Sequence, residues 1–167
     1  MIGIPGQTYE DLANDIVLFR TMDLDMIGVG PYLPHPATPL GQGKVTVAAP
    51  EAEQVPNTEL MTYKVIALTR IVCPLANIPS TTALATLNRE SGREVGLSRG
   101  ANVVMPNLTP QPYRASYEIY PAKACLYEPP HEFDAALKRR ILALGRQIGT
   151  GPGHSKRRDR AALAARG

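Results

Sequence analysis

Cysteine is scarce in this sequence: the chain has only Cys73 and Cys125, 52 residues apart. This number and spacing argue against a disulfide-held scaffold and fit a protein of a reducing cytoplasm. Long hydrophobic runs are missing too, since no apolar segment approaches the roughly 20 residues that span a bilayer. The first residues lack the charged segment of a secretory signal. We therefore expect a cytoplasmic protein with no membrane partner.

The net excess of positive charge lies at the end of the chain. The formal net charge is +3, but residues 154–167 carry five Lys/Arg against one Asp, a net of +4. A basic tail can bind nucleic acid through counterion release, but such tails are more often solvated and poorly ordered. No basic face interleaved with aromatics and no zinc-ligand spacing supports nucleic-acid binding. We expect a flexible basic tail over 150–167 and no nucleic-acid partner.

Apolar and polar stretches alternate along the remaining chain as βα units do. The expected elements are strand 1–5, helix 8–22, strand 25–33, helix 57–74, strand 77–86, a short helix 89–98 and strand 101–107. Thr8 and Asp11 form a Thr-x-x-Asp pattern that predicts a capped start of the first helix. On that helix, the apolar residues that share one face are Leu12, Ile16 and Phe19, with Met22 further on. Residues 41–56 are predicted to form a surface loop.

This alternation predicts an α/β fold with a parallel sheet and right-handed crossovers. Four such units make half of a (βα)8 TIM-type barrel, and an open doubly wound sheet is the alternative. The predicted organisation is a half-barrel over 1–108, a loop and helix that pack on it over 109–149, and the tail over 150–167. The last helix is expected from a stripe of Phe133, Leu137, Ile141 and Leu144, and Gly145 can end it.

Polar and conformationally special residues follow the predicted strands, where the chemistry of such a barrel lies. They are Gly6, Gln7 and Thr8 after the first strand, Pro31 to Pro36 after the second, Thr81 and Thr82 in the third, and Met105 and Asn107 at the end of the fourth. The pattern therefore predicts a binding site at the carboxyl ends of the strands.

Five stretches sharpen this expectation when they are taken in order. They are MIGIPGQTYEDL, DMIGVGPYLPHPATPL, ALTRIVCPLANIPSTTAL, SRGANVVMPNLTPQPYR and YEIYPAKAC. Together they resemble the C-terminal half of the HydE-type maturases of FeFe-hydrogenase. These are radical S-adenosylmethionine (SAM) enzymes of the branch that contains biotin synthase and methylornithine synthase. The resemblance runs from Met1 to about Gly153 and is weakest in the loop 41–56 and in the tail.

The resemblance implies that four further βα units precede these residues in the family, with a Cys-x-x-x-Cys-x-x-Cys loop that ligates a 4Fe–4S cluster. We therefore expect a fragment, a truncated gene model or the product of a split gene. SAM and the cluster are the cofactors of the full-length family. Two distant cysteines cannot hold the cluster, so we expect no metal or catalytic residue in this chain and no activity without the missing half.

Family positions also imply site residues. For SAM these are Ile2, Gly3, Ile4, Gly6 and Met26, and for the substrate they are Thr81, Thr82, Met105, Asn107 and Tyr120. The paired threonines would hold an amino-acid carboxylate, because two hydroxyls can donate hydrogen bonds without adding a full charge.

Each of these assignments has a plainer alternative. Met26 would pack in the core, the threonines would be ordinary strand residues, and Asn107 would cap the next loop. Tyr113, Tyr117 and Tyr120 would form a packed aromatic cluster. Arg114 and Lys123 would bind anions or simply be exposed charges.

Some maturases carry an accessory cluster on a Cys-x7-Cys-x2-Cys pattern. Cys125 fits its first position, but Phe133 and Ala136 stand at the other two, so we predict no accessory cluster.

The resemblance implies the substrate- and SAM-binding half of a radical SAM maturase that builds the FeFe-hydrogenase active-site cluster. Expected partners are an amino-acid-like or organometallic small molecule, the missing N-terminal half-barrel and other hydrogenase maturases. One alternative is a fragment with activity like methylornithine synthase or biotin synthase. The other is a non-catalytic half-barrel that only binds a ligand.

Overall fold

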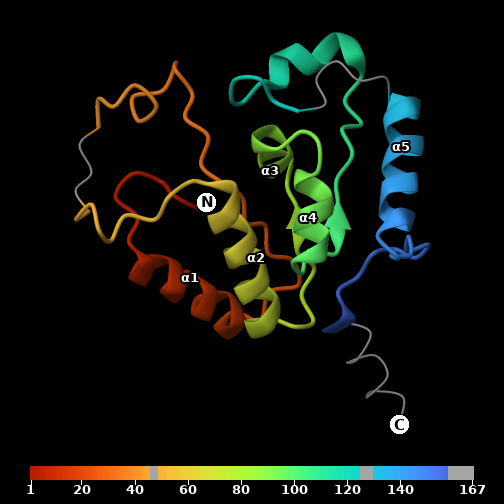
Figure 1. Ribbon diagram of the computed structural model, residues 1–167, viewed down its shortest axis with the longest axis horizontal. Helices are drawn as coiled ribbons and strands as arrows, with labels where there is room; N and C mark the ends of the chain where they lie inside the picture. Colours follow the sequence, from red (N-terminus) through yellow and green to blue (C-terminus); the bar gives the residue numbers. More distant parts are fainter. Residues whose placement is uncertain (46–48, 125–129, 158–167) are drawn as a thin grey trace.

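The computed structural model describes residues 1–45, 49–124 and 130–157 (Figure 1). Its helices are α1 (Tyr9–Thr21), α2 (Glu59–Val72), α3 (Thr82–Leu87), α4 (Gly92–Ser98), the 3-10 helix η1 (Gln111–Tyr117) and α5 (Pro130–Ala143). The two regular strands are β1 (Pro79–Ser80) and β2 (Val103–Val104). The helices expected over 8–22, 57–74 and 89–98 are thereby confirmed, as is the last helix.

Four extended segments pair side by side, and the pairings that join them are parallel, whereas a separate bridge between Thr8 and Gln54 is antiparallel. Ile2 forms a bridge with Pro31, Met26 forms one with Asn77, and β1 pairs with β2. The pairings join the segments in the order in which they occur along the chain. The fold is therefore mixed α/β with a small parallel sheet, as predicted. It is compatible with half of a (βα)8 barrel, which remains a prediction.

The predicted strands are too long. Those expected over 1–5, 25–33 and 101–107 are reduced to isolated bridges or to the two residues of β2. The strand expected over 77–86 ends at Ser80, and α3 begins at Thr82. The cause is local, because the hydroxyl oxygen of Thr81 accepts the N–H of Leu84 at 3.3 Å and so caps a helix.

Helix α1 begins where the Thr-x-x-Asp pattern predicts. The Thr8 hydroxyl oxygen accepts the Asp11 N–H at 3.1 Å, and the Asp11 carboxylate accepts the Thr8 N–H at 2.9 Å. This reciprocal capping satisfies two N–H groups that the helix cannot bond itself. Leu12 and Ile16 are buried as expected, but Met22 is exposed because the helix ends at Thr21 and the chain turns away.

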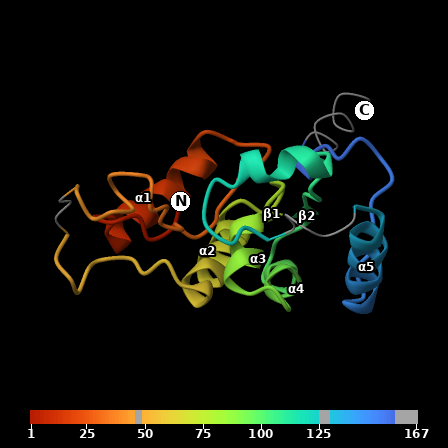
Figure 2. The same cartoon turned by 90° about the horizontal axis from the view of Figure 1, so that it is seen from above.

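The core lies between the sheet and its helices. The sheet contributes Ile2, Ile27, Val29 and Ile78, and the helices contribute Leu12, Ile16, Val65, Ile66 and Leu84. In Figure 2, α2, α3 and α4 lie on one side of β1 and β2, and η1 lies on the other. No helix within the described residues is both long and apolar enough to cross a membrane.

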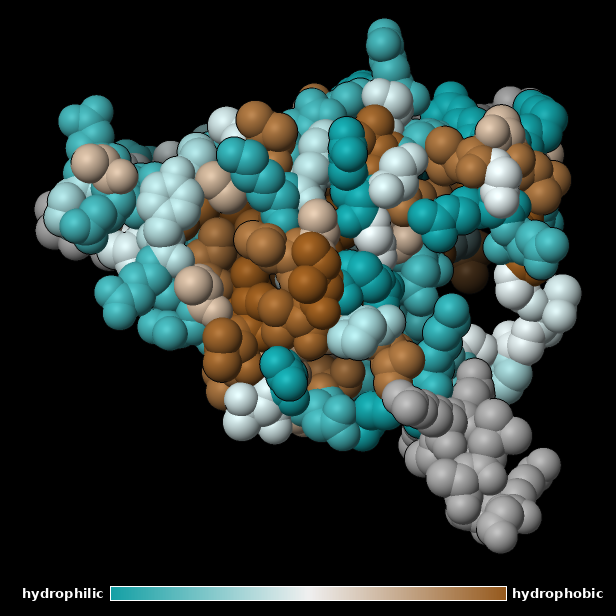
Figure 3. Space-filling model, turned by 60° about the horizontal axis from the view of Figure 1, so that its bottom comes forward, coloured by the Kyte–Doolittle hydropathy of each residue, from teal (hydrophilic) through white to brown (hydrophobic). Residues whose placement is uncertain are grey.

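Helices α1 and α2 expose part of their apolar surface. Leu68 and Ile71 of α2 are exposed, and so is Val17 of α1. Val17 and Leu68 border a groove of about 460 Å³ between the two helices. Figure 3 shows this apolar area on the face that the two helices form. The apolar stripe of α2 is therefore only partly core, since Val65 is buried and Leu60 is exposed.

The segment expected as a plain surface loop contributes to packing at its end. Val55 is buried, and the side-chain amide of Gln54 bonds the Pro5–Gly6 turn. That amide accepts the N–H of Gly6 at 2.7 Å and donates to the carbonyl of Ile4 at 3.1 Å. Gly6 itself has φ +87°, a backbone conformation that favours glycine.

The end of the described chain lies against the amino ends of two paired segments. Asn77 donates from its side chain to the carbonyl of Gly153 at 2.9 Å, and the buried hydroxyl of Ser155 bonds Asp25. Arg157 forms ion pairs with Asp23 and Asp25. Residues 153–157 of the predicted tail therefore have specific partners. Residues 158–167 lie outside the described part.

Candidate functional site

One cavity of about 470 Å³ lies at the carboxyl ends of the paired segments. It is lined by Met1, Gly28, Gly30, Pro31, Tyr32, Leu33, His35, Thr38, Thr81, Thr82, Ala83, Ile119 and Tyr120. Three of the five predicted substrate residues, Thr81, Thr82 and Tyr120, are therefore brought together, although Tyr120 lies about 40 residues away from the threonines in sequence. The cavity is the candidate site.

The paired threonines line the cavity because α3 begins directly after β1 ends. Thr81 is the N-cap of α3, and Thr82 is its first residue. The capping bond uses the Thr81 oxygen as an acceptor, so its O–H remains able to donate to another group. In a straight strand, adjacent residues point to opposite faces. Because Thr81 and Thr82 lie at the start of a helix instead, both can line the same cavity.

Gly30 makes room for Thr81. A Cβ on Gly30 would lie 2.7 Å from the Thr81 hydroxyl oxygen, which is too close for any other residue without movement of Thr81. Gly28 also lines the cavity, but a Cβ there would meet nothing within 4 Å. The two glycines therefore differ: one is required by the position of Thr81, and the other leaves the cavity open.

Met105 and Asn107 do not line this cavity. Met105 is exposed, and the Asn107 side-chain oxygen accepts the Thr109 N–H at 3.1 Å. The loop-capping alternative for Asn107 thus describes its observed bond. Arg114 is buried and donates to the carbonyls of Thr109 at 2.8 Å and Asn107 at 3.2 Å, so its guanidinium organises this loop.

The three clustered tyrosines separate in the structure. Tyr113 and Tyr117 are exposed, whereas Tyr120 is half-buried and lines the cavity. The alternative of a packed aromatic cluster is therefore wrong, because η1 turns the first two rings to the surface. Lys123 donates to the Tyr117 carbonyl at 2.8 Å.

The residues predicted to contact SAM lie apart from this cavity. Ile2 belongs to the core, and a Cβ on Gly3 would lie 2.4 Å from the backbone nitrogen of Asn57. The Ile4 carbonyl and the Gly6 N–H are bonded by Gln54. Met26 is 49% exposed, so it does not belong to the core that this chain forms. It lies in the same extended segment as Gly28 and Gly30.

Two residues of the cavity wall, Tyr32 and His35, were not singled out by sequence reasoning. The signal was present, because both lie in the Pro31–Pro36 stretch at the predicted end of the second strand. Proline-rich stretches are predicted to be loops, and that prediction does not indicate which of their side chains line a site.

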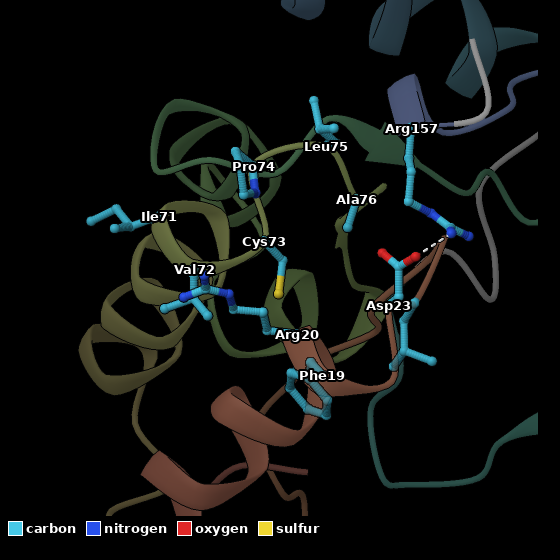
Figure 4. Close-up of a pocket in the computed structure, with 11 residues that line it drawn as sticks. Phe19, Arg20, Asp23, Ile71, Val72, Cys73, Pro74, Leu75, Ala76 and Arg157 are labelled. Atoms are coloured by element: carbon cyan, nitrogen blue, oxygen red, sulfur yellow. Dashed lines mark hydrogen bonds and ion pairs between the residues drawn. The ribbon is translucent and has the colours of Figure 1, made fainter. Parts of the chain in front are cut away.

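A second pocket, of about 400 Å³, lies at the opposite, amino ends of the segments (Figure 4). It contains Cys73, the residue that follows α2, with Arg20 on one side and the Asp23–Arg157 ion pair on the other. Burial raises the pKa of the Cys73 thiol, although Arg20 and Arg70 oppose this effect. The thiol is therefore kept protonated, which does not suit a nucleophile or a metal ligand.

The donor set of the chain does not fit a 4Fe–4S cluster. The sequence has two cysteines, whereas the family's motif needs three closely spaced thiolates. Among the residues that the structure describes, no three His, Cys, Asp or Glu side chains gather as a metal site would require. Cys125 and the side chain of Phe133, which bear on the accessory cluster, lie outside the described residues.

Comparison with known proteins was made for the whole chain. No family model matches it. The chain is 43% identical over 157 residues to the [FeFe] hydrogenase maturase subunit HydE of Thermotoga maritima. This alignment covers 94% of the chain and 42% of the relative, so the chain spans less than half the length of the protein that it matches. The resemblance to HydE-type maturases is thereby confirmed for one part of such a protein.

Proposed function

We propose that this chain, as a relative of part of HydE, is the substrate-binding wall of a radical SAM maturase of FeFe-hydrogenase. The observation that carries the proposal is the cavity in which Thr81, Thr82 and Tyr120 meet at the carboxyl ends of parallel segments. This is where barrel enzymes place their ligands. The similarity to HydE supplies the reaction class.

The chemistry that this wall can perform is binding and orientation. The Thr81 and Thr82 hydroxyls can donate to one carboxylate, and the Tyr120 phenol lines the same space. Neutral donors hold an anion without leaving a buried charge when the ligand departs. The proposed ligand is a small amino-acid-like molecule, or an organometallic one that carries such a carboxylate.

A second part of the proposal concerns SAM. The backbone groups of Ile4 and Gly6 already have partners in Gln54, so we place the nucleoside toward Met26, on the exposed face of the sheet. When bound with a reduced cluster, SAM supplies the 5′-deoxyadenosyl radical in this family. Because these residues do not fit the cluster, its ligands must come from residues outside this sequence.

The direct test is complementation. The chain is co-expressed with the cluster-binding part of the Thermotoga relative, copurified anaerobically, and assayed for 5′-deoxyadenosine after reduction. We expect release by the complex and none by either part alone. In the same assay, Thr82→Val should reduce substrate-dependent release, whereas Thr21→Val, an exposed threonine of α1, should not.

Two results would contradict the proposal. Full release by the Thr82→Val complex at every substrate concentration would remove the threonines from the site. A complex that binds SAM or an amino acid but never releases 5′-deoxyadenosine would instead support the non-catalytic binding module. Hydrogenase and maturase genes beside this one would favour the maturase over a methylornithine- or biotin-synthase-like role.

A further inference from the structure

The wall of the candidate cavity contains a tyrosine whose backbone is fixed at two points. The N–H of Tyr32 donates to the carbonyl of Ile2 at 2.8 Å, and its own carbonyl accepts from the side chain of Asn57 at 2.9 Å. These bonds tie the residue to the first extended segment and to the segment that precedes α2. The backbone of Tyr32 is therefore held by the fold.

The hydroxyl of this side chain is buried but unused within the protein. Among the described residues, it has no hydrogen-bond partner. Tyr63 offers the contrast, since this partly buried tyrosine donates its hydroxyl to Glu59. Buried hydroxyl groups are nearly always bonded, so this unsatisfied hydroxyl, on a residue that lines the cavity, points to a partner from outside the chain.

A second polar group from the same stretch faces the same space. His35 lines the cavity, and its Nδ1 accepts the N–H of Ala37 at 3.1 Å. That bond assigns the proton of the neutral ring to Nε2, which is then a donor. Tyr32 and His35 therefore add hydrogen-bonding groups to the wall that also carries Thr81 and Thr82.

We propose that Tyr32 is a specificity-determining residue, whose hydroxyl bonds a second polar group of the ligand whose carboxylate the threonines hold. The inference rests on the proposed function and narrows its substrate class. The ligand must carry a hydrogen-bonding group besides the carboxylate, as the ammonium of an amino acid does. A simple fatty or keto acid would leave the phenol without a partner and would bind less well.

The test measures binding of L-cysteine and of propionate to the copurified complex by isothermal titration calorimetry. We compare the unaltered chain with Tyr32→Phe, and with Tyr113→Phe as a control on an exposed ring outside the cavity. Loss of one hydrogen bond to the charged ammonium should weaken L-cysteine binding about ten- to a hundredfold in Tyr32→Phe. Propionate binding should hardly change, and neither ligand should respond to Tyr113→Phe.

A structural role for the hydroxyl is separated by thermal unfolding of the same variants. Because the hydroxyl bonds nothing within the described chain, Tyr32→Phe should melt at the same temperature as the unaltered protein or higher. A clear fall in melting temperature, or unchanged L-cysteine affinity, would overturn the inference. If Thr82→Val weakens binding and Tyr32→Phe does not, only this inference fails. If the unaltered complex binds no amino acid, the proposed substrate-binding function fails, and the inference with it.

Discussion

The two faces of the parallel sheet differ sharply, and the difference is visible in adjacent residues. Ile27 is 2% exposed and packs with the helices, whereas Met26, one residue earlier, is 49% exposed. Met105 at the end of the fourth segment is exposed in the same way. Parallel sheets usually have both faces covered, because each strand presents apolar side chains to both sides.

The difference between the two faces of the sheet bears on the function of the chain. The face of the sheet that the helices cover belongs to the hydrophobic core. The other face is open and carries Met26, Gly28 and Gly30 beside the candidate cavity. In a barrel, the corresponding face points inward toward the ligand. The exposed face is therefore what a wall of a larger binding chamber would present, which supports the proposed maturase role.

The largest expected effect concerns a tight backbone contact at Gly3, in the first extended segment. Gly3 has φ +75°, and a Cβ there would lie 2.4 Å from the Asn57 backbone nitrogen. We expect Gly3→Ala to cost about 4 kcal/mol, from backbone strain and overpacking together. Gly43→Ala is the matched control, since its φ is +67° but a Cβ meets nothing within 4 Å. It should cost only about 1–2 kcal/mol. Equal losses in urea unfolding would refute this assignment.

The next prediction tests the two faces directly. Ile27→Ala should lower the free energy of unfolding by about 3 kcal/mol, because it empties a closed core. Met26→Ala should change it by less than about 0.5 kcal/mol, because that side chain is half in solvent. The same Met26→Ala chain should copurify less well with the cluster-binding part. Comparable destabilisation by both variants would mean that the open face is also core.

A smaller effect is expected where the open face meets the site. Gly30→Ala would place a Cβ 2.7 Å from the Thr81 hydroxyl oxygen, and we expect a loss of about 1–2 kcal/mol together with weaker amino-acid binding. Gly28→Ala has free space and should be neutral in stability, or slightly stabilising. Thermal unfolding and calorimetric binding distinguish the two. If Gly30→Ala binds the amino acid as tightly as the unaltered chain does, the observed position of Thr81 is not required for binding.

How much could be predicted from the sequence depended on the range of the interactions involved. Helices were located well, because the Thr8 cap and the apolar spacing of Leu12 and Ile16 act within a few residues. The threonine pair and Tyr120, which the family resemblance placed at one site, line the same cavity. The strands were not delimited, since pairing at Ile2 or Asn77 depends on partners tens of residues away. Met105 and Asn107 lie outside this cavity, in a loop whose Arg114 contacts could not be predicted from the sequence for a similar reason.

The smallest predicted effect lies on the outer surface of the covering helices and depends on pH. The Thr8 N–H, which the Asp11 carboxylate accepts, holds the pKa of that carboxyl below its ordinary value. A lowered pKa in the folded state means that the ionised form contributes stability above the ordinary pKa, and that this contribution is lost as the pH falls through the lowered value. Melting temperatures of the unaltered chain and of Asp11→Asn should therefore differ at neutral pH and converge below about pH 4. Asp15→Asn, which removes an exposed carboxylate of the same helix outside the capping box, is the control and should leave the melting temperature nearly unchanged at neutral pH. A constant difference across the pH range would mean that the cap acts through its shape and not through its charge.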